Sequence, residues 1–198
     1  GARNCGSLSG GRPRGRVGVS VFRGFPDRAE AGRRLADALC GYARALSLLV
    51  LALPRGGVPV GWEVARRLGA PLDLLLVRKL GVPGHPELAM GAIASGGARV
   101  LNADIVEGLG IGEDAVARVE REEAAELRRR ESVYRGDRPP VHVRGRAVIV
   151  VDDGIATGAT MRAGLEALRR REPAALVAAA PVASAAACEE LSRVARLV

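Results

Sequence analysis

One stretch of the sequence limits the fold more than any other. Residues from Ala147 to Val151 form an apolar run without polar alternation, which ends abruptly in two carboxylates, Asp152 and Asp153. Such a run is typical of a strand buried on both faces, as in a parallel sheet. A loop of small residues and a helical pattern from about Met161 follow. Because ligands bind where the carboxyl ends of parallel strands meet their loops, we expect both aspartates at a binding edge.

The loop at residues 156–160 (Ala-Thr-Gly-Ala-Thr) has the composition of an anion site. It offers backbone N–H groups and two hydroxyls at the start of a helix, where a phosphate dianion binds favourably. The simpler alternative is a structural role, in which the aspartates only end a strand and Thr157 only caps a helix. The coincidence of acidic pair, loop and helix favours the binding site.

A second strand–loop–helix unit lies earlier in the chain. The apolar run from Leu46 to Leu53 precedes Pro54-Arg55-Gly56-Gly57, and a helix is predicted over Val58 to Leu68. Two glycines let the backbone approach a ligand closely, and an arginine adds a positive fork suited to phosphate oxygens. A tight turn without a ligand is the alternative for this loop.

A basic pair follows the third predicted strand, Leu72 to Val77. The pair is Arg78 and Lys79, and Lys79 is the single lysine among thirty basic residues. We favour a functional role over two surface charges at a strand end. The next segment, Leu80 to Glu87, is predicted to be irregular because glycines and prolines are frequent in it. His85 lies in this segment, and an exposed histidine without a catalytic role is favoured.

The alternation of strands and helices predicts an α/β fold, a doubly wound and mostly parallel sheet with short antiparallel strands in addition. Trp62 is expected in the core. The other predicted elements are a helix from Asp27, short strands over Ala89–Ser95 and Arg99–Leu101, a long helix over Ile111–Val133 with one solvated face, an edge strand over Val141–Val143, a strand over Ala175–Ala180, a helix over Ala185–Ala195 and the start of a strand at Arg196–Val198.

The net charge of +8 is concentrated at the N-terminus. Five of the arginines precede the first acid, Asp27, and subtracting them leaves +3 for the remainder. No aromatic residues alternate with the basic ones, which disfavours a nucleic-acid partner. Residues 1–21, rich in Gly, Arg and Ser, are predicted to be a disordered basic tail. Residues 22–198 are predicted to be a single domain, and a C-terminal truncation stays open because the chain stops where another strand begins.

Three weaker signals in the sequence bear on the cellular location of the protein. The three cysteines show no disulfide or metal spacing, and the N-terminus lacks the apolar segment of a secretory signal. No apolar run approaches the ~20 residues of a membrane span. These signals together favour a cytoplasmic protein without a membrane partner.

The run from Val150 to Thr160 resembles the PRPP-binding signature of the type I phosphoribosyltransferases, where PRPP is 5-phosphoribosyl-1-pyrophosphate. The loop at residues 54–57 resembles the pyrophosphate loop of that family, which often contains a cis peptide bond. The basic pair at 78–79 matches a pair that contacts PRPP, and residues 80–87 resemble a flexible loop that closes over the site. The whole pattern is most similar to bacterial proteins predicted to be phosphoribosyltransferases, which carry Leu-Pro-Arg-Gly-Gly and Val-Asp-Asp-Gly-x-Ala-Thr-Gly.

The resemblance implies a Mg²⁺-dependent transfer of the phosphoribosyl group from PRPP to a nitrogen acceptor, a nucleobase as in nucleotide salvage, with release of pyrophosphate. It implies catalytic roles for Arg55, Lys79, Asp152 and Asp153, and the two aspartates would also hold the metal through water and PRPP. The other PRPP-binding residues that it implies are Pro54, Gly56, Gly57, Arg78, Gly154, Ile155, Ala156, Thr157, Gly158, Ala159 and Thr160. A homodimer is compatible with the resemblance.

The acceptor is the least determined part of this hypothesis. Ala156 stands where the family's enzymes for 6-oxopurines carry an aspartate that acts on the base, so hypoxanthine and guanine are not favoured. No aromatic residue follows Tyr134 to stack on a base. A PRPP-sensing regulator with the same fold but no turnover is the alternative function, and a generic phosphosugar-binding protein is a third.

Overall fold

The computed structural model describes residues 24–45, 47–136, 138–139 and 141–198, so the predicted tail at 1–21 lies outside the described residues. In chain order the elements are α1 (Arg28–Ala38), a 3-10 helix η1 (Cys40–Arg44), β1 (Leu48–Ala52), α2 (Gly57–Leu68), β2 (Leu72–Leu74), β3 (Val77–Val82), β4 (His85–Ala94), β5 (Ala98–Leu101), α3 (Ala103–Gly108), α4 (Glu113–Arg135), β6 (Ala147–Val151), α5 (Ala159–Arg169), β7 (Ala175–Ala179), α6 (Ala185–Leu191) and β8 (Arg196–Leu197).

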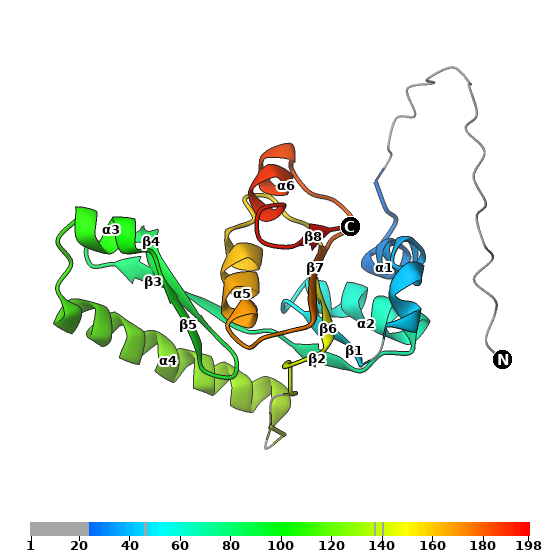
Figure 1. Cartoon of the computed structure of the whole chain (residues 1–198), viewed down its shortest axis with the longest axis horizontal. Helices are drawn as coiled ribbons and strands as arrows, with labels where there is room; N and C mark the ends of the chain where they lie inside the picture. The colour runs from blue at the N-terminus through cyan, green and yellow to red at the C-terminus, as the bar shows by residue number, and fades with distance from the viewer. Residues whose placement is uncertain (1–23, 46, 137, 140) are drawn as a thin grey trace.

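The main sheet has five parallel strands in the order β2-β1-β6-β7-β8. Every residue of β1 and of β6 is buried, as expected for central strands covered on both faces. Figure 1 shows α1 and α2 on one side of this sheet and α5 and α6 on the other, and the buried side chains form a separate cluster on each side. The predicted doubly wound α/β fold is confirmed.

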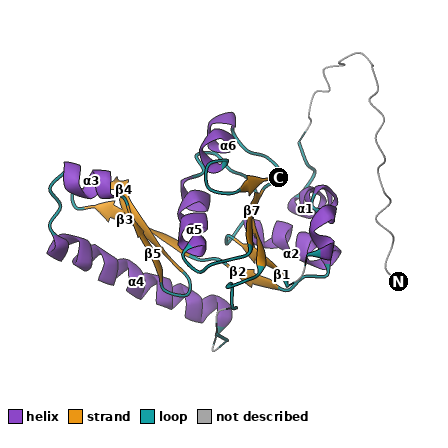
Figure 2. Cartoon of the chain, viewed as in Figure 1, coloured by secondary structure: helices purple, strands orange, loops and turns teal. Residues whose placement is uncertain are grey.

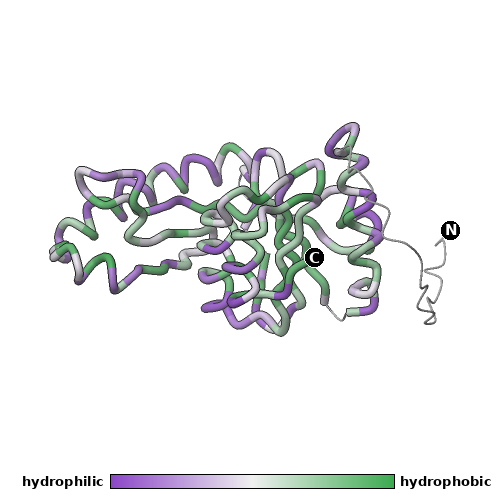
Figure 3. Tube along the Cα trace, turned by 90° about the horizontal axis from the view of Figure 1, so that it is seen from above, coloured by the Kyte–Doolittle hydropathy of each residue, from purple (hydrophilic) through white to green (hydrophobic). Residues whose placement is uncertain are grey.

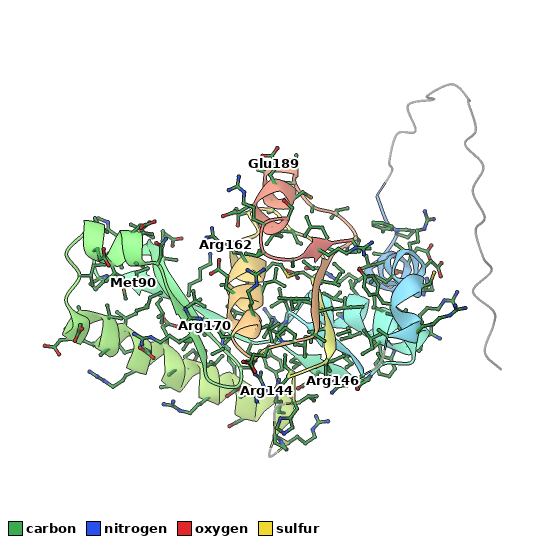
Figure 4. The ribbon with its side chains drawn as sticks, viewed as in Figure 1. Met90, Arg144, Arg146, Arg162, Arg170 and Glu189 are labelled. Carbon is green, nitrogen blue, oxygen red and sulfur yellow. The ribbon has the colours of Figure 1, made fainter. Side chains whose placement is uncertain are left out.

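A second, antiparallel sheet of β3, β4 and β5 extends from the main sheet (Figure 2). One of its faces packs on α4 around Leu80, Met90 and Ile93, and the other contacts α5 through Ala94 and Ala98. Met90 is labelled in this layer in Figure 4. The predicted short antiparallel strands are therefore present, and α4 and α5 are held on opposite faces of the same small sheet.

The long helix α4 is attached to the main sheet by its last residue. The buried side chain of Arg135 forms an ion pair with Asp73 at 3.1 Å and donates a hydrogen bond to the carbonyl of Leu74, both on β2. Only Val116, Leu127 and Arg135 are buried along this helix, so its outer face is solvated as predicted. Figure 3 shows the same contrast, with hydrophobic residues gathered in the central strands and hydrophilic residues frequent along α4.

One predicted strand is divided between the two sheets in the structure. The strand predicted over Leu72–Val77 is wrong as one element, because β2 ends at Leu74 and β3 starts at Val77. Between them, the N–H of Leu75 bonds to β1 and the N–H of Leu76 bonds to the hydroxyl of Ser95. The chain therefore changes sheets at this point, and the basic pair at 78–79 lies inside β3 rather than after a strand of the main sheet.

The irregular loop predicted over Leu80–Glu87 is also wrong, because this segment is the tip of the β3–β4 hairpin. Gly84 has a φ of +83° at its turn, and a β-carbon on Gly81 would lie 2.8 Å from the carbonyl oxygen of Pro86. The glycines thus serve a turn and a close strand contact. His85 is exposed at the start of β4.

Three further predictions have definite outcomes. The edge strand over Val141–Val143 is wrong, because the N–H of Val141 bonds to the side chain of Asp73 and this segment joins no strand. Trp62 is 58% exposed rather than buried, because α2 packs through Val60, Gly61, Val64, Ala65 and Leu68. The helix start at Asp27 is confirmed, since its side chain accepts a hydrogen bond from the N–H of Glu30. In the described chain, no helix has the length and apolarity to cross a membrane.

Candidate active site

Two loops meet at the carboxyl edge of the main sheet. Strands β1 and β6 pair in parallel, and Ala52 lies opposite Val151. The N–H of Leu53 then bonds to the carbonyl of Val151 at 2.9 Å. The loop after β1 and the acidic pair after β6 therefore leave the sheet side by side, as the two apolar runs predicted.

The glycines after β1 lie directly against the acidic pair. A β-carbon on Gly56 would lie 2.1 Å from Oδ2 of Asp153, and one on Gly57 would lie 2.7 Å from the carbonyl oxygen of Val151. No larger residue fits without displacing the carboxylate. The peptide bond between Pro54 and Arg55 is cis, as the resemblance implied. Helix α2 starts at Gly57, and the N–H groups of Gly57 and Val58 bond back to the carbonyls of Leu53 and Arg55, which fixes the shape of this loop.

The two aspartates have different environments. Asp152 is half-buried, and its Oδ1 accepts a hydrogen bond from the N–H of Asp153 at 2.9 Å. Burial raises the pKa of Asp152 to about 6, and the neighbouring carboxylate of Asp153 adds to the rise, while the hydrogen bond from the backbone of Asp153 opposes it. Because Asp152 gains its charge near neutral pH, ligand binding at this edge should depend on pH.

Asp153 is bound by an arginine that the sequence reasoning missed. The Nε and Nη2 atoms of Arg28, the first residue of α1, each lie 2.8 Å from Oδ2 of Asp153. The two residues are 125 positions apart, so no local pattern connects them. Arg28 thus brings a second guanidinium to the edge that already holds Arg55.

The loop after the aspartates leads into the open N-terminus of α5. The N–H of Ile155 bonds to the carbonyl of Val182, and the hydroxyl of Ser184 donates to the carbonyl of Ala156 at 2.6 Å. Gly158 is the N-cap residue of α5, with a φ of +74°, and the hydroxyl of the preceding Thr157 accepts a long hydrogen bond of 3.5 Å from the N–H of Ala159. The N–H groups of Thr160 and Met161 precede the first bond within the helix, which runs from Arg162 to Gly158, so they are oriented to bind an anion.

A cavity of about 320 Å³ lies between the loop after β1 and the start of α5. Pro54 and Arg55 line it from the loop, and Thr160 lines it from the first turn of α5. Arg129, Arg130, Val133 and Tyr134 of α4 complete the lining, over a floor of Leu53, Leu75, Leu76 and Val77. Sequence reasoning did not predict the contribution of α4, because its charge pattern is that of an ordinary solvated helix.

Comparison with known proteins bears directly on this geometry. Residues 25–195 match the family profile described as phosphoribosyl transferase domain. This chain belongs to that family. Two curated proteins of Mycobacterium tuberculosis strains, both named provisionally as phosphoribosyl transferases, are 49% identical to this chain over 158 residues. The match covers 80% of this chain but 35% of each relative, so the chain spans about a third of their length.

A solved structure shows the same arrangement. TT1426 from Thermus thermophilus is 44% identical to this chain, and its crystal structure superposes with a TM-score of 0.80. The superposition covers 88% of this chain and 82% of that one. The fold is therefore shared with a protein of known structure.

The basic pair at 78–79 is divided between two faces of β3. Arg78 points to α4, where it pairs with Glu123 through bonds of 2.5 and 2.6 Å. Lys79 is exposed on the other face and lines a cavity of about 440 Å³ with Ala159 and Arg162 of α5. Arg162 is itself bound to Glu166 and Glu190 and is labelled in Figure 4. Lys79 thus lies beside the start of α5, and the structure does not bring Arg78 to Arg55.

The acidic pair at 152–153 suits a partly hydrated metal ion. Within the described ranges, no three side chains of His, Cys, Asp or Glu gather into a group that could hold a metal. Asp152 and Asp153 offer two adjacent carboxylates instead. Mg²⁺ commonly keeps several waters and is bound by one or two carboxylates together with substrate phosphates. The residues present therefore fit Mg²⁺ that arrives with a phosphorylated substrate.

Proposed function

We propose that this chain transfers the 5-phosphoribosyl group of PRPP to a nitrogen acceptor and releases pyrophosphate. The observation that carries the proposal is the meeting of two loops at one sheet edge. Gly56 lies against Asp153, and Arg55 and Thr160 line one cavity. An acidic pair that can accept from a diol, a helix N-terminus and an arginine loop are the groups that a phosphoribosyl donor requires.

Each loop has a distinct role in this proposal. Asp152 and Asp153 accept hydrogen bonds from the vicinal hydroxyls of ribose. The loop from Gly154 to Thr160 binds the 5-phosphate through backbone N–H groups and the hydroxyls of Thr157 and Thr160. This binding energy, remote from the reacting carbon, positions the anomeric centre.

The reaction breaks the bond between C1 of ribose and the pyrophosphate oxygen and forms a bond from C1 to the acceptor nitrogen. The electron pair of the broken bond leaves with pyrophosphate, and the acceptor nitrogen loses its proton. Arg55 and the backbone at Gly56 and Gly57 stabilise the charge that develops on the leaving oxygen. Mg²⁺, held at Asp152 and Asp153, would supply further neutralisation of that charge when it is bound.

The acceptor in this proposal is a nucleobase nitrogen, which would place the protein in nucleotide salvage. Ala156, which is exposed beside the acidic pair, brings no carboxylate to the acceptor. A base that needs no such carboxylate, such as adenine or uracil, suits this site better than hypoxanthine or guanine.

The test is release of pyrophosphate from PRPP with Mg²⁺ in the presence of a panel of nucleobases. We expect turnover with at least one base and a marked loss of it in Thr160→Val, which keeps the side-chain shape but removes a hydroxyl. Ser192→Ala, which removes a hydroxyl at the end of α6, should retain activity. PRPP binding without turnover on any base would contradict the enzyme and support the PRPP-sensing regulator.

A further inference from the structure

The cavity beside Arg55 has a wall that no loop of the PRPP signature supplies. Its lining from α4 consists of Arg129, Arg130, Val133 and Tyr134. Together with Arg55, two of these residues bring three guanidinium groups to a space of about 320 Å³. So much positive charge around one cavity indicates an anionic ligand with several oxygens.

The position of this wall is fixed by the attachment of α4 to both sheets. Arg135 is buried and paired with Asp73 of β2. Nearer the N-terminus of the same helix, Glu123 pairs with Arg78 and Glu120 pairs with Arg99, and both arginines lie on the antiparallel sheet. These contacts hold the turn that carries Arg129 and Arg130 beside the carboxyl ends of β1 and β2. The two arginines therefore face the cavity because of the fold.

Both arginines can exchange their present partner for a ligand. Each is hydrogen-bonded to Glu126 in the same helix, and their side chains remain 66% and 43% exposed. Exposed pairs of this kind contribute little to stability, so a phosphate oxygen competes easily for the guanidinium. The two arginines hold the pKa of Glu126 at about 2, so this carboxylate stays ionised and keeps both side chains near the cavity.

The geometry of the proposed reaction selects which anion enters. The 5-phosphate is assigned to the N-terminus of α5, from which Thr160 is the residue that lines this cavity, whereas Arg55, Arg129 and Arg130 bring their positive charge to it. Arg55 belongs to the loop that receives the leaving group. In a displacement at C1 the acceptor and the leaving group lie on opposite sides of the ribose, so the side that holds Arg55 is closed to the acceptor. The anion left for this cavity is the diphosphate.

We propose that α4 is the third wall of the diphosphate site, where Arg129 and Arg130 bind the diphosphate of PRPP and the pyrophosphate that is released. This assignment rests on the proposed function. It makes α4 a source of leaving-group stabilisation, in addition to Arg55 and the backbone of Gly56 and Gly57. The guanidinium fork suits this task because it can donate two parallel hydrogen bonds to one phosphate.

The test compares two probes by isothermal titration calorimetry on the full chain with Mg²⁺. Pyrophosphate carries only the group assigned to the cavity, and ribose 5-phosphate carries only the diol and the 5-phosphate. In the double variant R129Q/R130Q we expect the pyrophosphate affinity to fall by at least about tenfold, because charge-assisted bonds are lost. The ribose 5-phosphate affinity should stay within about twofold of the wild type, because its contacts are elsewhere.

Arg128→Gln is the matched control, since Arg128 is an exposed neighbour in α4 that does not line the cavity. It should leave both affinities unchanged. An unchanged pyrophosphate affinity in the double variant would overturn the assignment, and so would an equal loss for ribose 5-phosphate, which would give the cavity to the 5-phosphate. Failure of the proposed function gives a different result, in which the wild type itself binds neither PRPP nor ribose 5-phosphate.

Discussion

Replacing Asp152 by asparagine should stabilise the ligand-free protein while it weakens the site. Burial raises the pKa of this carboxyl from 3.8 to about 6, so its charged form is unfavourable in the folded state. The difference between these values corresponds to about 3 kcal/mol at 1.36 kcal/mol per pKa unit. Because Asp152 is only partly buried and is coupled to Asp153, we expect about 1–1.5 kcal/mol of this to be recovered.

The pH dependence gives the direction of the effect. Between about pH 4 and pH 6 the unfolded chain releases the Asp152 proton before the folded chain does, so the wild type loses stability as the pH rises. Above pH 6 the loss is complete. The asparagine variant lacks this loss and keeps an acceptor for the N–H of Asp153. Its advantage should therefore be near zero at pH 4 and full at pH 7.5.

Urea unfolding followed by circular dichroism at pH 4, 5, 6 and 7.5 measures this difference. Glu107→Gln, which neutralises an exposed carboxylate on α3, is the control and should show no such growth with pH. An Asp152→Asn protein that is less stable than the wild type at pH 7.5, or an advantage equal at pH 4 and 7.5, would refute the reasoning. PRPP affinity should fall in the same variant, which separates stability from function at one residue.

Three substitutions test the packing around the site. Gly56→Ala places a β-carbon 2.1 Å from Oδ2 of Asp153, so calorimetry should show PRPP binding abolished, whereas Gly41→Ala, whose β-carbon meets nothing within 4 Å, should bind normally. Gly158→Ala imposes a φ of +74° on a residue with a side chain, and urea unfolding should show a loss of about 1–2 kcal/mol. Leu165→Ala leaves a cavity at a fully buried position beside the sheet, and the free energy of unfolding should fall by about 2–5 kcal/mol in the same measurement. An unfolding free energy equal to that of the wild type would contradict the placement of Leu165 in the core.

The elements that carry the site were predictable because their signals are local. An unbroken apolar run that ends in acids, as at Ala147–Asp153, predicts a central parallel strand and a polar edge without knowledge of the rest of the chain. The glycines at 56 and 57 likewise mark a close backbone approach, and the structure identifies its partner as Asp153. The shared edge then follows from the parallel pairing of β1 and β6.

The contributions from distant segments could not be predicted. The ion pair between Arg28 and Asp153 joins residues 125 positions apart, and Arg129 and Arg130 show only the i,i+3 and i,i+4 pairing typical of an exposed helix. The glycine-rich segment at 80–87 was predicted as a loop because glycine signals both mobility and tight turns. In the structure β3 pairs with β4, so this segment forms a hairpin with a tight turn.

The measurement that tests the central claim most directly is the affinity of Mg²⁺-PRPP for the wild type and for Asp153→Asn by calorimetry. In the proposed reaction, this carboxylate accepts hydrogen bonds from the ribose hydroxyls beside Gly56 and Arg28. The neutral amide accepts through only one atom and loses the negative charge, so we predict a marked loss of affinity. Unchanged affinity in Asp153→Asn would contradict the assignment of this edge as the ribose-phosphate site.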